Sequence, residues 1–379
     1  MKKIIILGCG ISGVTLARLY AEKNYQVDIY ETRDHIGGNC YDYYDNHGIL
    51  VHKYGPHIFH TSNEIVYKFI NRFCKLNGYI NKVKVKVGNK IVPLPINFKS
   101  IKQIFPLEAN YIIKKLVNLY RNQKTITLSE LQNIKDKKIH LLFKYIYKNV
   151  YANYSQKMWS VPIKLLSKDI INRVQITLSY GESYFPNDKY QGLPKEGYTK
   201  FIENMLNHKN IKIHLKARED ILKFKGNMTY INNIKCNDKI FYCGSIDRLF
   251  KYKFGKLNYR SLYIHFQSFK KSKYQPSAIV NYPSHPLMTR CCEYKQMTLQ
   301  NSQWTTVSKE YPGKHSLSSW KFKEPFYSIN DERNRKLHDI YKGKIKRYKN
   351  IHLLGRIAEY KYFDMDDAIQ NAMHLVKAN

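Results

Sequence analysis

Short apolar runs and a glycine-rich turn alternate over the first thirty residues of the chain. Lys3–Leu7 is apolar and rich in β-branched side chains, which predicts a buried parallel strand. Residues 8–13 hold three glycines, and apolar side chains then recur at helical spacing from Val14. A second strand is predicted at Gln26–Tyr30, directly before Glu31. This order of strand, turn, helix, strand and acidic residue is typical of a dinucleotide-binding fold.

Each glycine of the turn has a physical reason in that fold. Gly8 makes the tight turn, Gly10 lets a pyrophosphate approach the backbone, and Gly13 lets helix and strand pack closely. The pyrophosphate then lies at the helix N-terminus, where we expect Ser12 to join the glycines as a contact. Glu31 would accept hydrogen bonds from the ribose hydroxyls, which disfavours a 2′-phosphate. This pattern by itself leaves NAD and FAD open.

Two further stretches favour FAD. Residues 33–39, with two adjacent glycines, are similar to the second glycine pair of flavoproteins, where backbone amides reach the flavin phosphates. Near the C-terminus, residues 351–354 predict another short strand, followed by Gly355 and Arg356 and then a helix from about Asp366. In flavoproteins such a unit sets a helix N-terminus against the flavin and stabilises negative charge on the reduced ring. We therefore expect FAD, held by both ends of the chain.

The middle of the chain changes its periodicity twice. Residues 82–92 alternate strictly between charged and apolar positions and turn at Gly88-Asn89, which predicts a hairpin with one charged face. Residues 100–170 show apolar positions at i, i+3 and i+4 with few glycines, which predicts a helical region. Segments near 173–190 and 257–311 return to a β-rich, aromatic composition. The chain is thus expected to be α/β.

The 379 residues carry a formal charge of +35, but the lysines are spread through every segment. Their densest stretch is 342–349, and no nucleic-acid recognition module accompanies them. We expect a general attraction for small anionic substrates and no specific nucleic-acid partner. The 33 tyrosines supply rings with a polar end for planar or phosphate-bearing ligands.

Cysteine usage and hydropathy bear on the compartment. The seven cysteines form no C-x-x-C pair, which favours a reducing cytosol and no structural zinc. No apolar run reaches 18 residues, so no transmembrane helix is expected. These features predict a cytoplasmic protein without a metal site.

A series of short motifs runs in order through the chain. It opens with HKYGPHIFHT at 52–61 and ends with GRIAEYKYFDM at 355–365. Between them lie YSQKMW at 154–159, YF at 184–185, YQGLP at 190–194, GYTK at 197–200, YRSL at 259–262, TR at 289–290, KEYP at 309–312 and EPFY at 324–327. This series resembles the UDP-galactopyranose mutase family over essentially the whole chain. Gln156, Met158 and Ser160 depart from the family's loop sequence, near the expected nucleotide site.

The resemblance implies an isomerase that interconverts UDP-galactopyranose and UDP-galactofuranose for cell-surface glycan synthesis. Reduced FAD would act through N5 as the nucleophile and form a flavin–sugar adduct, without net redox change. A sister mutase acting on UDP-N-acetylgalactosamine, UDP-arabinopyranose or dTDP-fucopyranose remains the alternative. An amine-oxidase-like flavoenzyme shares the dinucleotide pattern but does not require the later motifs. The partners expected are a sugar nucleotide and a second copy of the chain, as a homodimer.

The resemblance also assigns site residues. The catalytic set is Arg173, Arg290 and His60. The substrate-binding set is Asn81, Tyr154, Trp159, Arg173, Tyr184, Arg290, Tyr327, Tyr362 and Asp364. The cofactor-binding set is Gly8, Gly10, Ser12, Gly13, Glu31, Arg33, Gly38, Asn39, His57, His60, Gly355, Arg356, Asp364 and Met365. Arginines suit the diphosphate because they stay charged and present donors in a fixed geometry.

The implied architecture has three parts. A discontinuous Rossmann-like FAD-binding domain would take residues 1–78, 191–256 and 328–379. A helical insert with a mobile substrate loop would take 98–170. An antiparallel β-sheet domain would take 79–97, 171–190 and 257–327.

Overall fold

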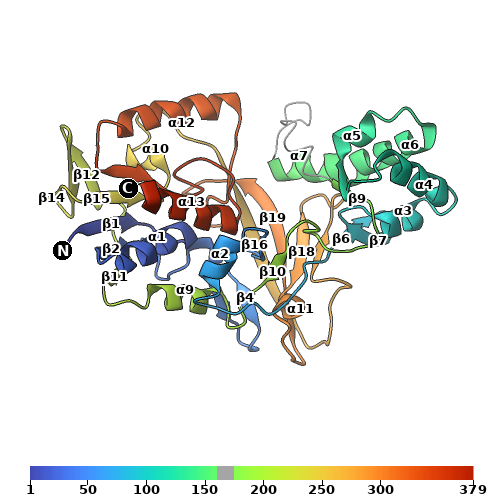
Figure 1. Ribbon diagram of the computed structural model, residues 1–379, viewed down its shortest axis with the longest axis horizontal. Coiled ribbons are helices and arrows are strands. Elements are labelled where there is room, and N and C mark those ends of the chain that lie inside the picture. Colours follow the sequence, from blue (N-terminus) through green and yellow to red (C-terminus); the bar gives the residue numbers. More distant parts are fainter. Residues whose placement is uncertain (160–174, 379) are drawn as a thin grey trace.

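The computed structural model describes residues 1–159 and 175–378. Figure 1 shows three parts along the longest axis of the molecule. A parallel sheet with helices lies at the end that holds both termini, a large sheet lies in the middle, and a group of helices lies at the far end. The predicted α/β class, with a Rossmann-like part and an antiparallel sheet, is confirmed.

The end that holds both termini is built on a five-stranded sheet whose neighbouring strands are all parallel. In spatial order the strands are β11 (Ile211–His214), β2 (Gln26–Tyr30), β1 (Lys3–Leu7), β15 (Lys239–Tyr242) and β21 (Ile351–Leu353). The continuous apolar run of β1 follows from burial on both faces, because Ile4 and Ile6 join one hydrophobic cluster and Ile5 and Leu7 join another. The predicted bounds of β1 and β2 are those observed.

Helices cover both faces of this sheet. On one face α1 packs between α9 and α13, as Figure 1 shows, and their apolar sides share a cluster with Ile4 and Ile6. On the other face lie a small antiparallel sheet and two helices. The helices of the first face are α1 (Ile11–Glu22), α9 (Tyr198–Leu206) and α13 (Met365–Ala378). The elements of the second are β12 (Leu222–Lys225), β13 (Met228–Ile231), β14 (Ile234–Cys236), α10 (Ile246–Leu249) and α12 (Glu332–Ile345).

The middle of the molecule is a seven-stranded sheet. Its neighbours are antiparallel except for β17 and β6, which run parallel. The hairpin predicted at 82–92 is confirmed as β6 and β7 at one edge. In spatial order the strands are β20 (Tyr327–Ser328), β16 (Tyr259–Phe269), β19 (Thr305–Lys314), β18 (Arg290–Glu293), β17 (Ile279–Asn281), β6 (Val83–Val87) and β7 (Lys90–Leu94).

Short elements join the two sheets. They are η1 (Gly38–Cys40), β3 (Asp42–Tyr44), β4 (Leu50–His52), β5 (Phe59–Thr61), α2 (Glu64–Ile70), β10 (Tyr190–Gly192) and α11 (Tyr294–Thr298). β10 pairs with β5 and β3 pairs with β4, so segments far apart in the chain meet between the sheets.

The helical end confirms most of the region predicted at 100–170, as far as the chain is described. Its elements are α3 (Phe98–Ile104), α4 (Ala109–Leu119), α5 (Leu128–Gln132), α6 (Lys137–Ile146), the π-helix η2 (Tyr147–Ala152) and α7 (Asn153–Trp159). Asp136 caps α6 and a Thr127–Glu130 capping box starts α5. The prediction missed β8 (Thr125–Thr127), which pairs with β9 (Gln175–Thr177). The residue ranges given above for three domains stay a prediction.

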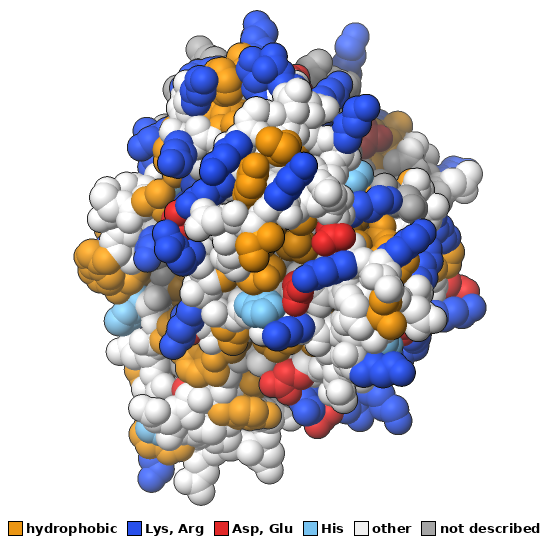
Figure 2. Space-filling model, turned by 90° about the vertical axis from the view of Figure 1, so that its left-hand side faces the viewer, with side chains coloured by type: hydrophobic (Ala, Val, Ile, Leu, Met, Phe, Trp, Pro, Cys, Tyr) orange, Lys and Arg blue, Asp and Glu red, His pale blue; other side chains and the backbone are white. Residues whose placement is uncertain are grey.

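Basic side chains are scattered over the face that Figure 2 shows, as the sequence predicts. Figure 2 faces the end that bears β12 and β14 in Figure 1, and its Lys and Arg side chains spread over the face among apolar and acidic ones. Among the described residues, no helix combines the length and apolar character needed to cross a membrane.

Candidate functional site

A large cavity runs between the five-stranded sheet, the seven-stranded sheet and α7. Its volume is about 1570 Å³. Pockets for one small ligand usually hold about 300–1,000 Å³, so this cavity has room for a dinucleotide and a second ligand side by side. Every site residue predicted above lines it except Arg173, which lies outside the described residues.

The glycine-rich turn after β1 leaves no room for side chains. Gly8 has a φ of +123°, and a Cβ there would lie 2.7 Å from the Cβ of Cys243. A Cβ on Gly13 would lie 2.2 Å from the carbonyl oxygen of Gly8. The backbone of this turn therefore faces the cavity at the N-terminus of α1, as a pyrophosphate site requires.

Glu31 lies at the end of β2 and is fixed by main-chain donors. Its carboxylate accepts from the backbone N–H of Cys9 (2.8 Å) and of Arg33 (3.0 Å). The side chain is buried yet lines the cavity. It can therefore brace the turn after β1 and still offer lone pairs to a ribose.

The second glycine pair packs directly on the first turn. Gly38 has a φ of +56°, and a Cβ there would lie 2.9 Å from the Cα of Gly10. The N–H of Gly37 donates to the carbonyl of Cys9 at 2.9 Å. Both segments thus form one cradle of backbone, which only glycine allows at the contact.

Arg33 connects this cradle to the other side of the cavity. Its Nη2 donates to Asn39 Oδ1 at 3.0 Å and to Glu324 Oε2 at 2.6 Å, and its guanidinium stacks 4.5 Å from the centre of the Tyr54 ring. Glu324 precedes β20, which carries Tyr327. This ion pair therefore joins the glycine cradle to the segment that leads into Tyr327.

The C-terminal strand and helix close the cradle. Gly355 follows β21 with a φ of +89°, and a Cβ there would lie 2.9 Å from Ser12 Oγ. Asp364 and Met365 stand at the N-terminus of the 14-residue helix α13 and line the cavity. The predicted strand at 351–354 and the predicted late helix are confirmed.

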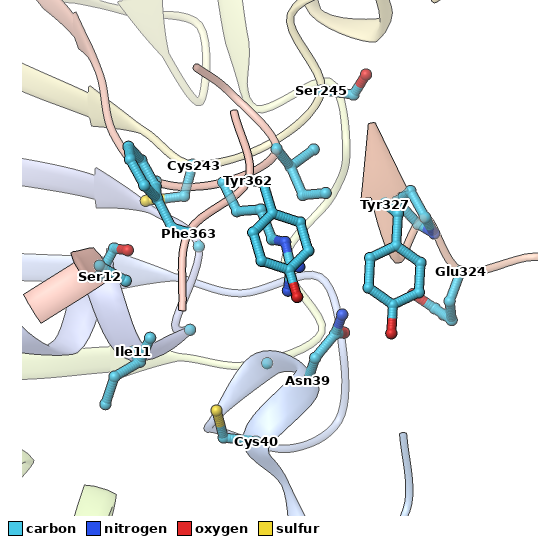
Figure 3. Close-up of a pocket in the computed structure, with 18 of the residues that line it drawn as sticks. Ile11, Ser12, Asn39, Cys40, Cys243, Ser245, Glu324, Tyr327, Tyr362 and Phe363 are labelled. Atoms are coloured by element: carbon cyan, nitrogen blue, oxygen red, sulfur yellow. The ribbon is translucent and has the colours of Figure 1, made fainter. Parts of the chain in front are cut away.

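Arg356 brings into the cavity a cation that forms no ion pair with the described residues. Its Nε and Nη2 are buried and have no hydrogen-bond partner in the described part of the chain. Its guanidinium lies 4.3 Å from the ring centre of Tyr362 and 5.0 Å from that of Tyr327. In Figure 3 these two rings stand side by side with their hydroxyl groups pointing the same way. A buried cation with unused donors suits an anionic ligand.

Arg290 is the second cation of the cavity, and it has an acidic partner. Its Nε donates to Glu310 Oε2 at 2.6 Å, across the pairing of β18 with β19. Burial alone would lower the pKa of Arg290, but the Glu310 carboxylate raises it well above its ordinary value. The guanidinium therefore stays charged, with its remaining donors available to a ligand.

Aromatic side chains line the wall beside Arg290. Tyr154 and Trp159 come from α7, and the Trp159 ring meets Tyr327 edge-on at 6.2 Å. Burial raises the pKa of Tyr154 above its ordinary value, so its hydroxyl stays protonated. Tyr184 is held by its backbone N–H, which donates to the carbonyl of Asn81 at 2.7 Å. These groups can stack on a planar base and donate to phosphate oxygens.

The two predicted histidines differ in their surroundings. Burial lowers the pKa of His57 to about 3, and its Nδ1 is hydrogen-bonded to the carbonyl of Gly55 at 2.8 Å. His57 is therefore neutral and turns Nε2 toward other partners as an acceptor. His60 pairs with Asp188 Oδ2 at 2.7 Å, and its ring stacks on Phe185 at 3.6 Å.

Sequence reasoning missed Asn281 as a site residue. It lines the cavity directly opposite Arg290 in the pairing of β17 with β18, and its Oδ1 is buried without a hydrogen-bond partner in the described chain. Asn281 lies outside the quoted motifs, and only the strand pairing brings it beside Arg290. An amide with an unused acceptor there can bind a hydroxyl group of a ligand.

Comparisons with known proteins agree with this geometry. The profile of the UDP-galactopyranose mutase family matches residues 149–362, and that of an NAD(P)-binding Rossmann-like domain matches 6–73. A UDP-galactopyranose mutase of Mycoplasma genitalium is 41% identical over 97% of this chain and 92% of its own length. A dTDP-fucopyranose mutase of Escherichia coli is 33% identical over 98% of this chain and 97% of its own length.

A solved structure supports the fold independently. The crystal structure of a reduced UDP-galactopyranose mutase superposes with a TM-score of 0.74 at 14% identity, over all of this chain and 94% of that chain. Together with the family profile and the curated relatives, it leaves one assignment: this chain belongs to the UDP-galactopyranose mutase family, whose members are isomerases.

Proposed function

We propose that this protein interconverts UDP-galactopyranose and UDP-galactofuranose with reduced FAD as its cofactor. The observation that carries the proposal is the joining of two sites in one cavity. A backbone cradle for a dinucleotide opens into a space that holds the cations Arg290 and Arg356 and the aromatic rings of α7. A nucleotide sugar can thus lie against a bound flavin.

FAD fits the cradle on three grounds. Gly10, Gly13 and Gly38 let a pyrophosphate approach the backbone, Glu31 stands where a ribose would lie, and the N-terminus of α13 faces the remaining space. The partial positive charge of that helix end favours an anionic reduced ring. When bound, reduced FAD supplies a nucleophilic N5 for the anomeric carbon of the sugar.

The residues of the chain have to hold the diphosphate while the sugar rearranges. Arg290 donates to it with a charge fixed by Glu310, and Arg356 offers donors that have no partner in the described protein. Arg173 lies outside the described residues, and its binding to the diphosphate stays a prediction. Tyr327 and Tyr362 stack beside Arg356 and present hydroxyl groups to the same anion.

The uridine is proposed to lie between Tyr154 and Trp159, since both rings line the cavity close to Arg290 and Tyr327. Asn81 and Asn281 offer amide groups to the sugar hydroxyls from the side of the seven-stranded sheet. His57, being neutral, can accept a hydrogen bond without adding charge near the flavin.

A sister activity on dTDP-fucopyranose is the second candidate, because a relative that bears that name covers 98% of the chain at 33% identity. The deciding experiment gives the reduced enzyme a panel of UDP-galactopyranose, UDP-N-acetylgalactosamine, UDP-arabinopyranose and dTDP-fucopyranose. Anion-exchange chromatography then separates pyranose from furanose products. We expect the largest kcat/KM for UDP-galactopyranose; a larger value for another sugar nucleotide would replace galactose in the proposal.

A further inference from the structure

The ammonium group of Lys157 joins α7 to the loop between β17 and β18. Its Nζ donates to four main-chain carbonyls of that loop, those of Tyr282 (2.9 Å), Pro283 (3.1 Å), Met288 (2.7 Å) and His285. The loop leads directly into Arg290, the first residue of β18. Helix α7 carries Tyr154 and Trp159. One ammonium group therefore connects the helix that carries Tyr154 and Trp159 to the loop that leads into Arg290.

A second cation, Arg260, binds the same end of α7. Arg260 of β16 donates through Nε to the carbonyl of Met158 at 2.6 Å and through Nη2 to that of Lys157 at 3.3 Å. Arg260 is only 3% exposed. The buried Arg260 guanidinium thus holds the two carbonyls that precede Trp159 in α7, and the Lys157 side chain holds the same turn to the loop.

The residues next to Lys157 in α7 and in the β17–β18 loop form part of the cavity wall. Met158, Trp159, Pro283 and Arg290 all line the cavity, and the carbonyl of Pro283 is one of the four that Lys157 binds. A shift of the loop on α7 would change the distance between Trp159 and Arg290. Small displacements of this kind, near 1 Å, can cost on the order of 100-fold in rate.

Within the described residues, the hydrogen-bond partners of the Lys157 ammonium group are main-chain carbonyls. No carboxylate contacts its ammonium group within residues 1–159 and 175–378, and burial lowers its pKa to about 8. The side chain of Lys157 is half-buried, and the loop carbonyls replace part of the water around its ammonium group. Its three donors converge on backbone groups that no apolar residue could satisfy.

From this geometry we infer that Lys157 is a positioning residue of the sugar-nucleotide site, which sets the spacing between the α7 aromatics and Arg290. The inference rests on the proposed function, because it concerns the same UDP site. Lys157 itself donates to backbone carbonyls and acts on UDP through its neighbours.

The test measures the dissociation constant of UDP by calorimetry in wild-type, Lys157→Met and Lys148→Met proteins. Methionine keeps the aliphatic length of lysine and removes the charge, and Lys148 is an exposed lysine of η2 on the same segment. We expect about a tenfold weaker UDP affinity in Lys157→Met. Bound flavin should be unchanged, because Lys157 does not line the cavity. Lys148→Met should bind UDP like the wild type.

The pH dependence separates positioning from a merely structural role. The ammonium group is charged below about pH 8 and loses its charge above it, so wild-type UDP affinity should fall between pH 7 and 9. In Lys157→Met the affinity should be weak throughout that range. The groups around Lys157 are Arg260, Tyr282, His285 and Lys309; burial lowers the pKa of His285 and raises that of Tyr282, which moves both away from this range.

Two results would overturn the inference: wild-type UDP affinity in folded Lys157→Met, or a wild-type affinity that stays constant from pH 7 to 9. If Lys157→Met does not fold, the pH titration of the wild type decides alone. A wild-type protein that binds flavin and no UDP at any pH would instead contradict the proposed function, so the two failures are distinguishable.

Discussion

Arg290 and Arg356 enter the same cavity in opposite electrostatic settings. Arg290 has a buried carboxylate partner, whereas Arg356 has buried donors without a partner in the described chain. The first arrangement keeps a permanent charge at the wall of the cavity, and the second leaves donors that no described residue satisfies and that a ligand can use. Removing each arginine should therefore have different effects on folding and on binding.

Arg290→Ala should lose most turnover while keeping its flavin. A hydrogen bond from a charged group is worth about 1.5–3 kcal/mol, so kcat/KM should fall by a factor of about 10–150. The substitution also strands Glu310, whose side chain is 2% exposed, and should lower the melting temperature.

The double variant Arg290→Ala with Glu310→Gln separates these two effects. It removes the stranded charge, so it should recover thermal stability while kcat/KM stays about 10–150-fold below that of the wild type. Wild-type kcat/KM in either variant would show that Arg290 does not hold the diphosphate. Arg173→Ala should resemble Arg290→Ala in activity.

Gly38→Ala should weaken FAD binding. Its φ of +56° disfavours a side chain by about 1–2 kcal/mol, and the added Cβ would lie 2.9 Å from Gly10 Cα. We expect purified wild-type protein to carry non-covalent FAD and the variant to carry less, measured by absorbance after denaturation.

The matched control for this substitution is Gly343→Ala in α12. A Cβ on Gly343 would meet no atom of the described residues within 4 Å, and alanine in a helix is more stable than glycine by about 0.5–1 kcal/mol. The control should keep all its FAD and melt slightly higher. Equal FAD content in the Gly38 and Gly343 variants would contradict the assignment of Gly38 to the FAD site.

His52 should make the protein sensitive to acid. It is 1% exposed, burial lowers its pKa to about 3, and its Nδ1 accepts from the N–H of His57. An unfolded histidine has a pKa of about 6.5, so the unfolded state binds more protons below that pH. The stability is fully present above pH 6.5 and is lost as the pH falls toward about 3.

His52→Asn tests this dependence, because the amide oxygen can replace Nδ1 as acceptor and does not titrate. The free energy of unfolding, measured from pH 7.5 to 4.5, should fall less steeply in the variant, by up to about 2–3 kcal/mol at the acidic end. If the free energy of unfolding falls equally steeply with pH in variant and wild type, His52 is not the cause of the acid sensitivity.

At the scale of elements, the sequence predicted what local pattern determines. The bounds of β1 and β2 follow from apolar runs that end at glycine or acid, and the hairpin of β6 and β7 follows from strict alternation and its turn. β8 has three residues, too few for a periodic signal, and it forms only because β9 pairs with it. The parallel pairing of β17 with β6 likewise depends on contacts between residues far apart in the chain.

The site shows the same division. Motif residues such as Gly8, Glu31 and Arg290 could be assigned by their place in ordered motifs, and the structure brings them to one cavity. Asn281 and Lys157 act through strand pairing and main-chain carbonyls that no local pattern encodes.

Helix α7 should report UDP binding through Trp159. Its ring is half-buried against Tyr327, whereas Trp320 is 77% exposed and Trp304 stacks on His47 at 3.8 Å. UDP should change the Trp159 emission, because the base would take the place of water at the indole. Trp159→Phe should abolish the change and weaken UDP binding.

A fixed structural role for Trp159 predicts the opposite pair of results. The variant would then melt at a lower temperature and bind UDP normally. In the wild type, UDP would leave the Trp159 part of the emission unchanged.

At the scale of the whole molecule, three separate stretches of the chain supply the five strands of the parallel sheet, and the first and last of them bring β1–α1 and β21–α13 together at one cradle. The seven-stranded sheet and α7 supply the opposite wall of the same cavity. A flavin and a nucleotide sugar bound there would meet between the two sheets, as the proposed function requires.

The most direct test of that claim is turnover of UDP-galactopyranose with and without reductant under strict exclusion of oxygen. Anion-exchange chromatography would follow the appearance of UDP-galactofuranose, with FAD content measured beside it. We expect furanose formation only with dithionite-reduced enzyme, and no reductant consumed per turnover. Equal rates with fully oxidised enzyme would contradict it.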